Sequence, residues 1–100
     1  MPAPLFLDVD PRTLHLPTSS RFGADPVKLQ RQIARYGTST AGMPNPWVYR
    51  GSDGGLVISN GVTRATRVAK LLPGTLIRVE VIGAFKTPVG HYPTVGDRLP

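Results

Sequence analysis

Residues 47–72 read WVYRGSDGGLVISNGVTRATRVAKLL and decide the fold of this 100-residue chain. The stretches 47–50 and 56–59 are rich in β-branched and aromatic residues, which favour strands. The Gly- and Asp-rich segment 51–55 between them has the composition of a hairpin loop. Apolar residues then recur at helical spacing along 61–72. The sequence therefore predicts a β-hairpin that is followed at once by a helix.

The helix after the hairpin is predicted to open at Asn60-Gly61 and to end at Pro73-Gly74. One face of it carries the apolar residues Ala65, Val68, Ala69 and Leu72. The opposite face carries the basic residues Arg64, Arg67 and Lys70. We expect the apolar face to be buried.

The rest of the chain adds a second helix and two more strands. Asp25 suits the N-cap, Pro26 the first helical position and Gly37 the C-cap, so a helix is predicted from Pro26 to Gly37. Residues 5–9 and 75–82 have strand composition. The expected fold class is α+β, with a small mixed β-sheet and two or more packed helices.

We expect residues 1–82 to form a single domain and the Pro- and Gly-rich residues 83–100 to form a tail that runs over the surface. Three aromatic residues are expected to pack in the core: Tyr36, Trp47 and Tyr49. The segment 14–16 is too short to assign to an element.

Composition excludes several classes of function. The chain has no cysteine, so disulfide frameworks, thiolate metal sites and thiol nucleophiles are absent. Hydrophobic residues make up 40% of it and charged residues 18%, as in globular proteins. No apolar run approaches the length of a membrane span, and the first eight residues do not resemble a signal peptide. We expect a cytoplasmic protein with no membrane partner.

The charge balance is basic, with twelve Lys and Arg against six Asp and Glu and a net charge of +6. Basic domains of this size often bind phosphate groups. Nine of the twelve cations are Arg, whose planar guanidinium binds phosphate through two parallel hydrogen bonds. Solubility is the alternative explanation for the excess charge.

The junction between the hairpin and the helix has the composition of an anion site. A glycine at a helix start lets a phosphate approach the free amide groups, and a nearby hydroxyl and guanidinium add donors. The candidate phosphate-binding residues are Asn60, Gly61, Thr63, Arg64 and Arg67. The alternative is that Asn60 is an ordinary N-cap and that the arginines form an ordinary solvated face.

The stretch from about residue 14 to residue 82 resembles the ParB/sulfiredoxin-like domain family. The resemblance rests on a helix that ends in Gly37, a strand that begins at Pro46, a G-x-x-R helix start at Gly61, and the alternating strand 77–81. In ParB-type partition proteins the matching segment is G-E-R-R and cradles nucleotide phosphates. In sulfiredoxins it is G-C-H-R and binds the phosphates of ATP. The resemblance implies the same fold and a phosphate-contact role for Gly61 and Arg64.

This chain departs from the family at two positions of that segment. Val62 stands where partition proteins have an acidic residue and sulfiredoxins have their cysteine, so sulfiredoxin chemistry is excluded. Thr63 stands where those families place Arg or His. The sequence therefore predicts a phosphate-binding module that holds a nucleotide or a nucleic-acid backbone. If a cofactor is present, we expect a nucleotide with Mg²⁺, and a homodimer is left open.

Two alternatives remain. One is a ParB-like nuclease or phosphodiesterase, for example a toxin, whose general base would be Asp53, Glu80 or His91. The other is a protein-interaction domain. Neither His15 nor His91 has the spacing of a metal ligand, so no metal site is expected. The absence of an obvious acid/base pair favours binding over catalysis.

Overall fold

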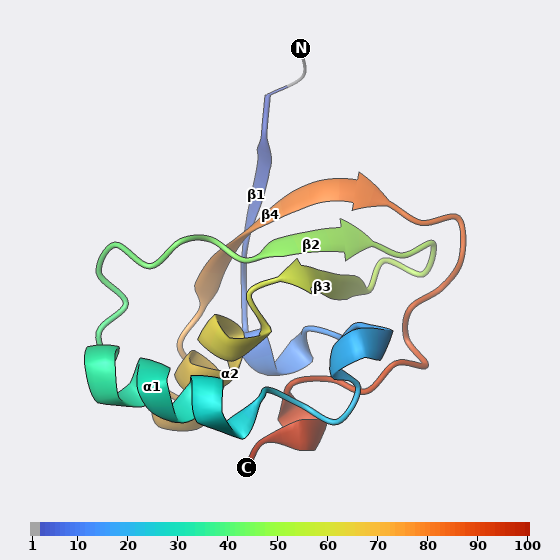
Figure 1. Cartoon of the computed structure of the whole chain (residues 1–100). Helices are drawn as coiled ribbons and strands as arrows, with labels where there is room; N and C mark the ends of the chain where they lie inside the picture. The colour runs from blue at the N-terminus through green and yellow to red at the C-terminus, as the bar shows by residue number, and fades with distance from the viewer. Residues whose placement is uncertain (1–2) are drawn as a thin grey trace.

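The computed structural model describes residues 3–100, which form a four-stranded sheet with two packed helices (Figure 1). The chain order is β1 (Leu5–Val9), η1 (Pro11–Thr13), η2 (Thr18–Ser20), α1 (Pro26–Tyr36), β2 (Trp47–Arg50), β3 (Leu56–Asn60), α2 (Val62–Leu71), β4 (Ile77–Ala84) and η3 (Gly96–Arg98). Here η denotes a single turn of 3-10 helix. The predicted α+β class is confirmed.

The sheet is mixed, with the strand order β1-β4-β2-β3. The outer pairs β1–β4 and β2–β3 are antiparallel, and the central pair β2–β4 is parallel. Val48 of β2 lies between Val81 of β4 and Ile58 of β3 in the register. Because side chains alternate along a strand, this register aligns the apolar residues of three strands on one face.

That face of the sheet packs against α2 and forms the core. Ala65, Val68 and Ala69 of α2 are fully buried, as their helical spacing predicts. The whole buried cluster comprises Leu14, Leu16, Val48, Ile58, Ala65, Val68, Ala69, Ile77, Val79 and Val95. Figure 1 shows α1 and α2 lying together below strands β2, β3 and β4 in that view. No helix within residues 3–100 is long and apolar enough to cross a membrane.

The C-terminal segment is part of this domain, so the expected surface tail at 83–100 is wrong. The segment 14–16 lies between β3 and the C-terminal residues. His15 exchanges backbone hydrogen bonds with Leu56 and Ile58, at 2.8 and 2.9 Å. On its other side, Leu16 N–H donates to the Pro93 carbonyl at 2.7 Å and Val95 N–H donates to the Leu14 carbonyl at 2.9 Å.

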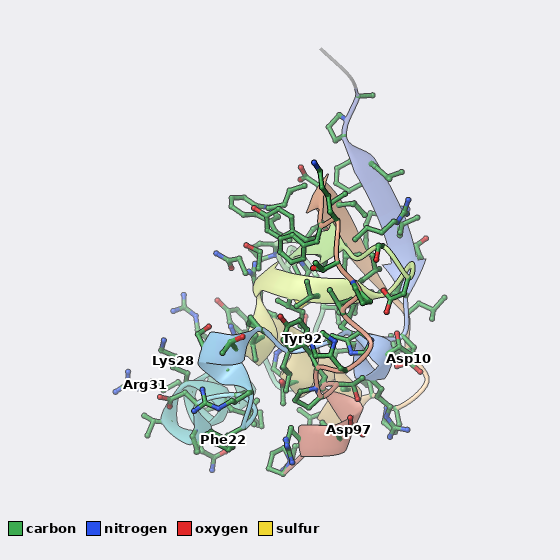
Figure 2. The ribbon with its side chains drawn as sticks, turned by 90° about the vertical axis from the view of Figure 1, so that its right-hand side faces the viewer. Asp10, Phe22, Lys28, Arg31, Tyr92 and Asp97 are labelled. Carbon is green, nitrogen blue, oxygen red and sulfur yellow. The ribbon has the colours of Figure 1, made fainter. Side chains whose placement is uncertain are left out.

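Two valines of the C-terminal segment are buried, since Val89 is 0% exposed and Val95 is 1% exposed. Figure 2 shows the C-terminal segment, with Tyr92 and Asp97 labelled, lying against the body of the domain. The domain therefore spans the described chain to its end. Sequence periodicity does not reveal this, because a single three-residue segment makes the bridging bonds.

The aromatic residues expected in the core lie outside it. Tyr36 is 46% exposed and Trp47 is 48% exposed. Tyr49 is half-buried and stacks on Phe85 with ring centroids 4.8 Å apart. Trp47 and Tyr49 flank Val48, so alternation along β2 places both on the face that the core does not cover.

Replacing Val95 with Ala tests the inclusion of the C-terminal segment in the core. Because Val95 is 1% exposed, losing two buried carbon atoms should lower the free energy of unfolding by about 2 kcal/mol. Urea unfolding measures the change. Val27→Ala is the matched control, since Val27 is 59% exposed and its loss should cost less than about 0.5 kcal/mol. Equal effects of the two substitutions would contradict the packing.

Candidate phosphate-binding site

The N-terminus of α2 carries no side-chain cap. Its N-cap residue is Gly61, in the left-handed conformation with φ 111°, and no side chain accepts a hydrogen bond from the first turn. The alternative in which Asn60 is an ordinary N-cap is therefore wrong. A helix leaves its first amide groups without internal acceptors, so the positive end of the helix dipole is open here.

Gly61 is required here for two reasons. Its positive φ is strained for any residue with a side chain. A Cβ at this position would also lie 2.8 Å from the Cβ of Pro46. The chain therefore brings the loop before β2 into direct contact with the start of α2.

Arg64 stands in the first turn of α2 and is held by neutral acceptors. Its Nη2 donates to Asn60 Oδ1 at 2.5 Å, and its Nη1 donates to the Pro44 carbonyl at 3.1 Å. Burial lowers the pKa of Arg64 because the partly desolvated guanidinium loses hydration. No carboxylate within residues 3–100 pairs with it. Asn60 thus positions the guanidinium instead of capping the helix.

A hollow of about 320 Å³ lies at this junction, and we call it the helix-start hollow. It brings together four of the predicted residues, Asn60, Gly61, Thr63 and Arg64. The other lining residues are Ser20, Asp25, Lys28 and Val62. No local sequence signal places Ser20, Asp25 or Lys28 in this site, because they precede α2 by more than thirty positions.

The charges around the hollow are Lys28, Arg64 and Asp25. Asp25 caps α1, and its Oδ1 accepts hydrogen bonds from the amides of Val27 and Lys28 at 2.8 and 3.1 Å. These bonds lower the pKa of Asp25, so the carboxylate is ionised at neutral pH. Figure 2 shows Lys28 projecting outward from α1. Two cations therefore face one carboxylate whose Oδ1 is engaged in capping.

Arg67, the fifth predicted residue, does not line this hollow. It is 2% exposed, so the alternative of an ordinary solvated arginine is wrong at this position. Its Nη1 donates to the carbonyls of Gly37 and Ser39, both at 2.8 Å, and its Nε donates to Gln32 Oε1 at 3.3 Å. The basic face of α2 turns toward the end of α1 at this position and away from water.

The three candidate general bases lie elsewhere. Asp53 is in the β2–β3 turn, at the end of β3 opposite to Gly61, and β3 is roughly 16 Å long at the usual rise per residue. His91 follows Gly90, whose amide donates to Asp53 Oδ2 at 2.9 Å. Glu80 lies on β4, in register with Trp47. The helix-start hollow contains no histidine and no carboxylate other than Asp25.

Comparison of the chain with family models, with curated proteins and with solved structures finds no match. The resemblance to the ParB/sulfiredoxin-like family therefore stays a prediction. Within residues 3–100, no group of three or more His, Asp or Glu side chains is placed to hold a metal ion.

The contact between Gly61 and Pro46 can be tested with a pair of alanine substitutions. Gly61→Ala should lower the free energy of unfolding by about 1–3 kcal/mol from strain at positive φ, with a further loss from the clash. Gly74→Ala is the control, because Gly74 also has positive φ and no heavy atom within 4 Å of its Cβ position. Thermal unfolding compares the two. A loss at Gly61 no larger than at Gly74 would contradict the close approach.

Asp53 should make the free energy of unfolding depend on pH in the acidic range. Backbone amides of Gly90 and Val89 hydrogen-bond to its carboxylate and lower its pKa below the ordinary 3.8. The contribution of Asp53 to the free energy of unfolding is therefore complete above the ordinary pKa of 3.8. It is lost as the pH falls through the lowered pKa of the folded protein. Asp53→Asn should be less stable than the wild type at neutral pH, and the difference should narrow on acidification. Urea unfolding across this pH range measures it, and a difference independent of pH would contradict the assignment.

Proposed function

We propose that this protein is a phosphate-binding module that holds a nucleotide or a nucleic-acid backbone in the helix-start hollow. The observation that carries the proposal is the uncapped N-terminus of α2 beside a guanidinium whose hydrogen-bond acceptors are neutral. A phosphate there would receive amide hydrogen bonds and the positive end of the helix dipole. It would also supply the anion that Arg64 lacks.

Each residue of the hollow has a distinct part in this proposal. The amides of residues 62–64 donate to the phosphate oxygens, and Gly61 lets the phosphate approach the backbone. A guanidinium has five N–H donors, and Arg64 uses two of them in the bonds to Asn60 and Pro44, so donors remain for a phosphate. Thr63 adds a hydroxyl, and Lys28 adds positive charge across the hollow.

The net charge of +6 supports a polyanionic partner. The resemblance to ParB and sulfiredoxin domains points to the same two residues, Gly61 and Arg64. Binding is favoured over catalysis because the hollow's one carboxylate, Asp25, has a lowered pKa and is a poor proton acceptor at neutral pH. Salt separates this proposal from a protein-interaction domain, since phosphate contacts weaken steeply as ionic strength rises.

Arg64→Ala tests the site. Losing a charged hydrogen-bonding group should lower the affinity for a phosphate ligand by about 1.5–3 kcal/mol. The affinity is measured by thermal-shift titration with nucleotides and short oligonucleotides, each with and without Mg²⁺, because a ligand that binds the folded state raises the melting temperature. Incubating any ligand that binds, and analysing the products, distinguishes binding from cleavage.

Arg31→Ala is the matched control, because Arg31 is exposed on α1 and its loss changes the net charge equally. We expect this variant to bind as the wild type does. If Arg64→Ala folds and retains full affinity, or if both variants lose affinity alike, the helix-start hollow is not the site.

A further inference from the structure

A second hollow lies on the other side of Arg64, and we call it the loop cleft. It has a volume of about 290 Å³ and lies between α1, the loop that follows it, and α2. Gln32 and Tyr36 line it from α1, Ser39 and residues 41–44 from the loop, and Arg64 and Arg67 from α2. Arg64 is the one residue that lines both the loop cleft and the helix-start hollow.

The loop cleft contains two guanidinium groups and no carboxylate. Arg67 is 2% exposed, and each of its hydrogen-bond acceptors is neutral. Its Nη2 has only the thioether sulfur of Met43, at 3.5 Å, which is a weak acceptor. The negative end of the α1 helix dipole offsets roughly half of the positive charge on Arg67. A buried cation without a full counter-charge is costly, so an anion in this cleft would be stabilised.

Besides the polar residues Gln32 and Ser39, the lining contains an aromatic ring and several apolar groups. The ring of Tyr36 lies 5.5 Å from the Arg67 guanidinium carbon and is partly open to solvent, at 46% exposure for the residue. Met43, Ala41 and Pro44 add apolar groups. The cleft is close to the lower size limit of small-molecule sites and is too large for a bare inorganic ion to fill. Its occupant needs a planar or apolar body as well as a charge.

We propose that the loop cleft binds a small organic monoanion, a carboxylate carried on a flat ring. The carboxylate accepts hydrogen bonds from Arg67 Nη2 and from Arg64, and the ring lies against Tyr36 and Met43. A carboxylate matches the planar guanidinium and costs less to desolvate than a doubly charged phosphate ester. This ligand is distinct from the phosphate proposed for the helix-start hollow. Because Arg64 lines both hollows, the tests of the two proposals are separated by residues that line only one of them.

Benzoate is the probe, and its neutral isostere benzamide is the control for charge. Titration of the full chain, followed through the backbone amide resonances, should show saturable shifts at residues 39–43 with benzoate. The affinity for benzamide should be at least about tenfold lower than the affinity for benzoate, because benzamide lacks the charge that the guanidinium groups recognise. Phenyl phosphate tests the other anion class and should bind more weakly than benzoate. Inorganic phosphate should shift residues 61–64 and leave 39–43 unchanged.

Ala41→Phe should block the loop cleft, because Ala41 is an exposed lining residue whose enlargement leaves both arginines in place. Its affinity for benzoate should fall at least about tenfold with a normal melting curve. Lys28→Met is the control, since Lys28 lines only the helix-start hollow, and it should bind benzoate normally. The proposal is overturned if benzoate gives no saturable shift at 39–43, if benzamide binds equally, if phenyl phosphate binds more tightly, or if folded Ala41→Phe keeps its affinity.

Discussion

The buried guanidinium of Arg67 holds together the part of the molecule in which α1, the 38–46 loop and α2 meet. It binds the carbonyls of Gly37 and Ser39 and so satisfies acceptors that the end of α1 leaves open. These bonds fix the start of the 38–46 loop against α2. The same loop supplies the Pro44 carbonyl that holds Arg64 and the Pro46 side chain that meets Gly61. Both hollows beside Arg64 therefore depend on the contact between α1 and α2.

Much of the fold was predictable because its signals are local. The hairpin, both helices and the buried stripe of α2 follow from composition and periodicity within single segments. The pairing of residues 14–16 with the C-terminal segment was not predictable, because it joins backbone groups far apart in the chain, Leu16 with Pro93 and Leu14 with Val95. Trp47 and Tyr36 show a second limit, since an aromatic residue at an apolar position of a strand or helix does not reveal whether that face is covered.

The candidate site was predicted in position and only partly in its interactions. The strand-to-helix junction brings Asn60, Gly61, Thr63 and Arg64 into one hollow, as expected. Asn60 binds the guanidinium of Arg64 and does not cap the helix. Which of the two bonds Asn60 makes depends on the position of the 38–46 loop, because that loop also holds Arg64. Arg67 shares a helix face with Arg64, but α1 covers it there. Such differences between neighbours on one face arise from tertiary packing, which helical spacing does not encode.

A titration of the isotopically labelled protein with a nucleotide tests the proposed anion site at the start of α2 most directly. Backbone amide resonances report binding residue by residue. The predicted result is a saturable shift of Val62, Thr63 and Arg64 that weakens as salt is added, because phosphate contacts are screened. Nucleotide and oligonucleotide ligands that leave these three amides unchanged, or that shift only amides remote from the helix-start hollow, would contradict an anion site there.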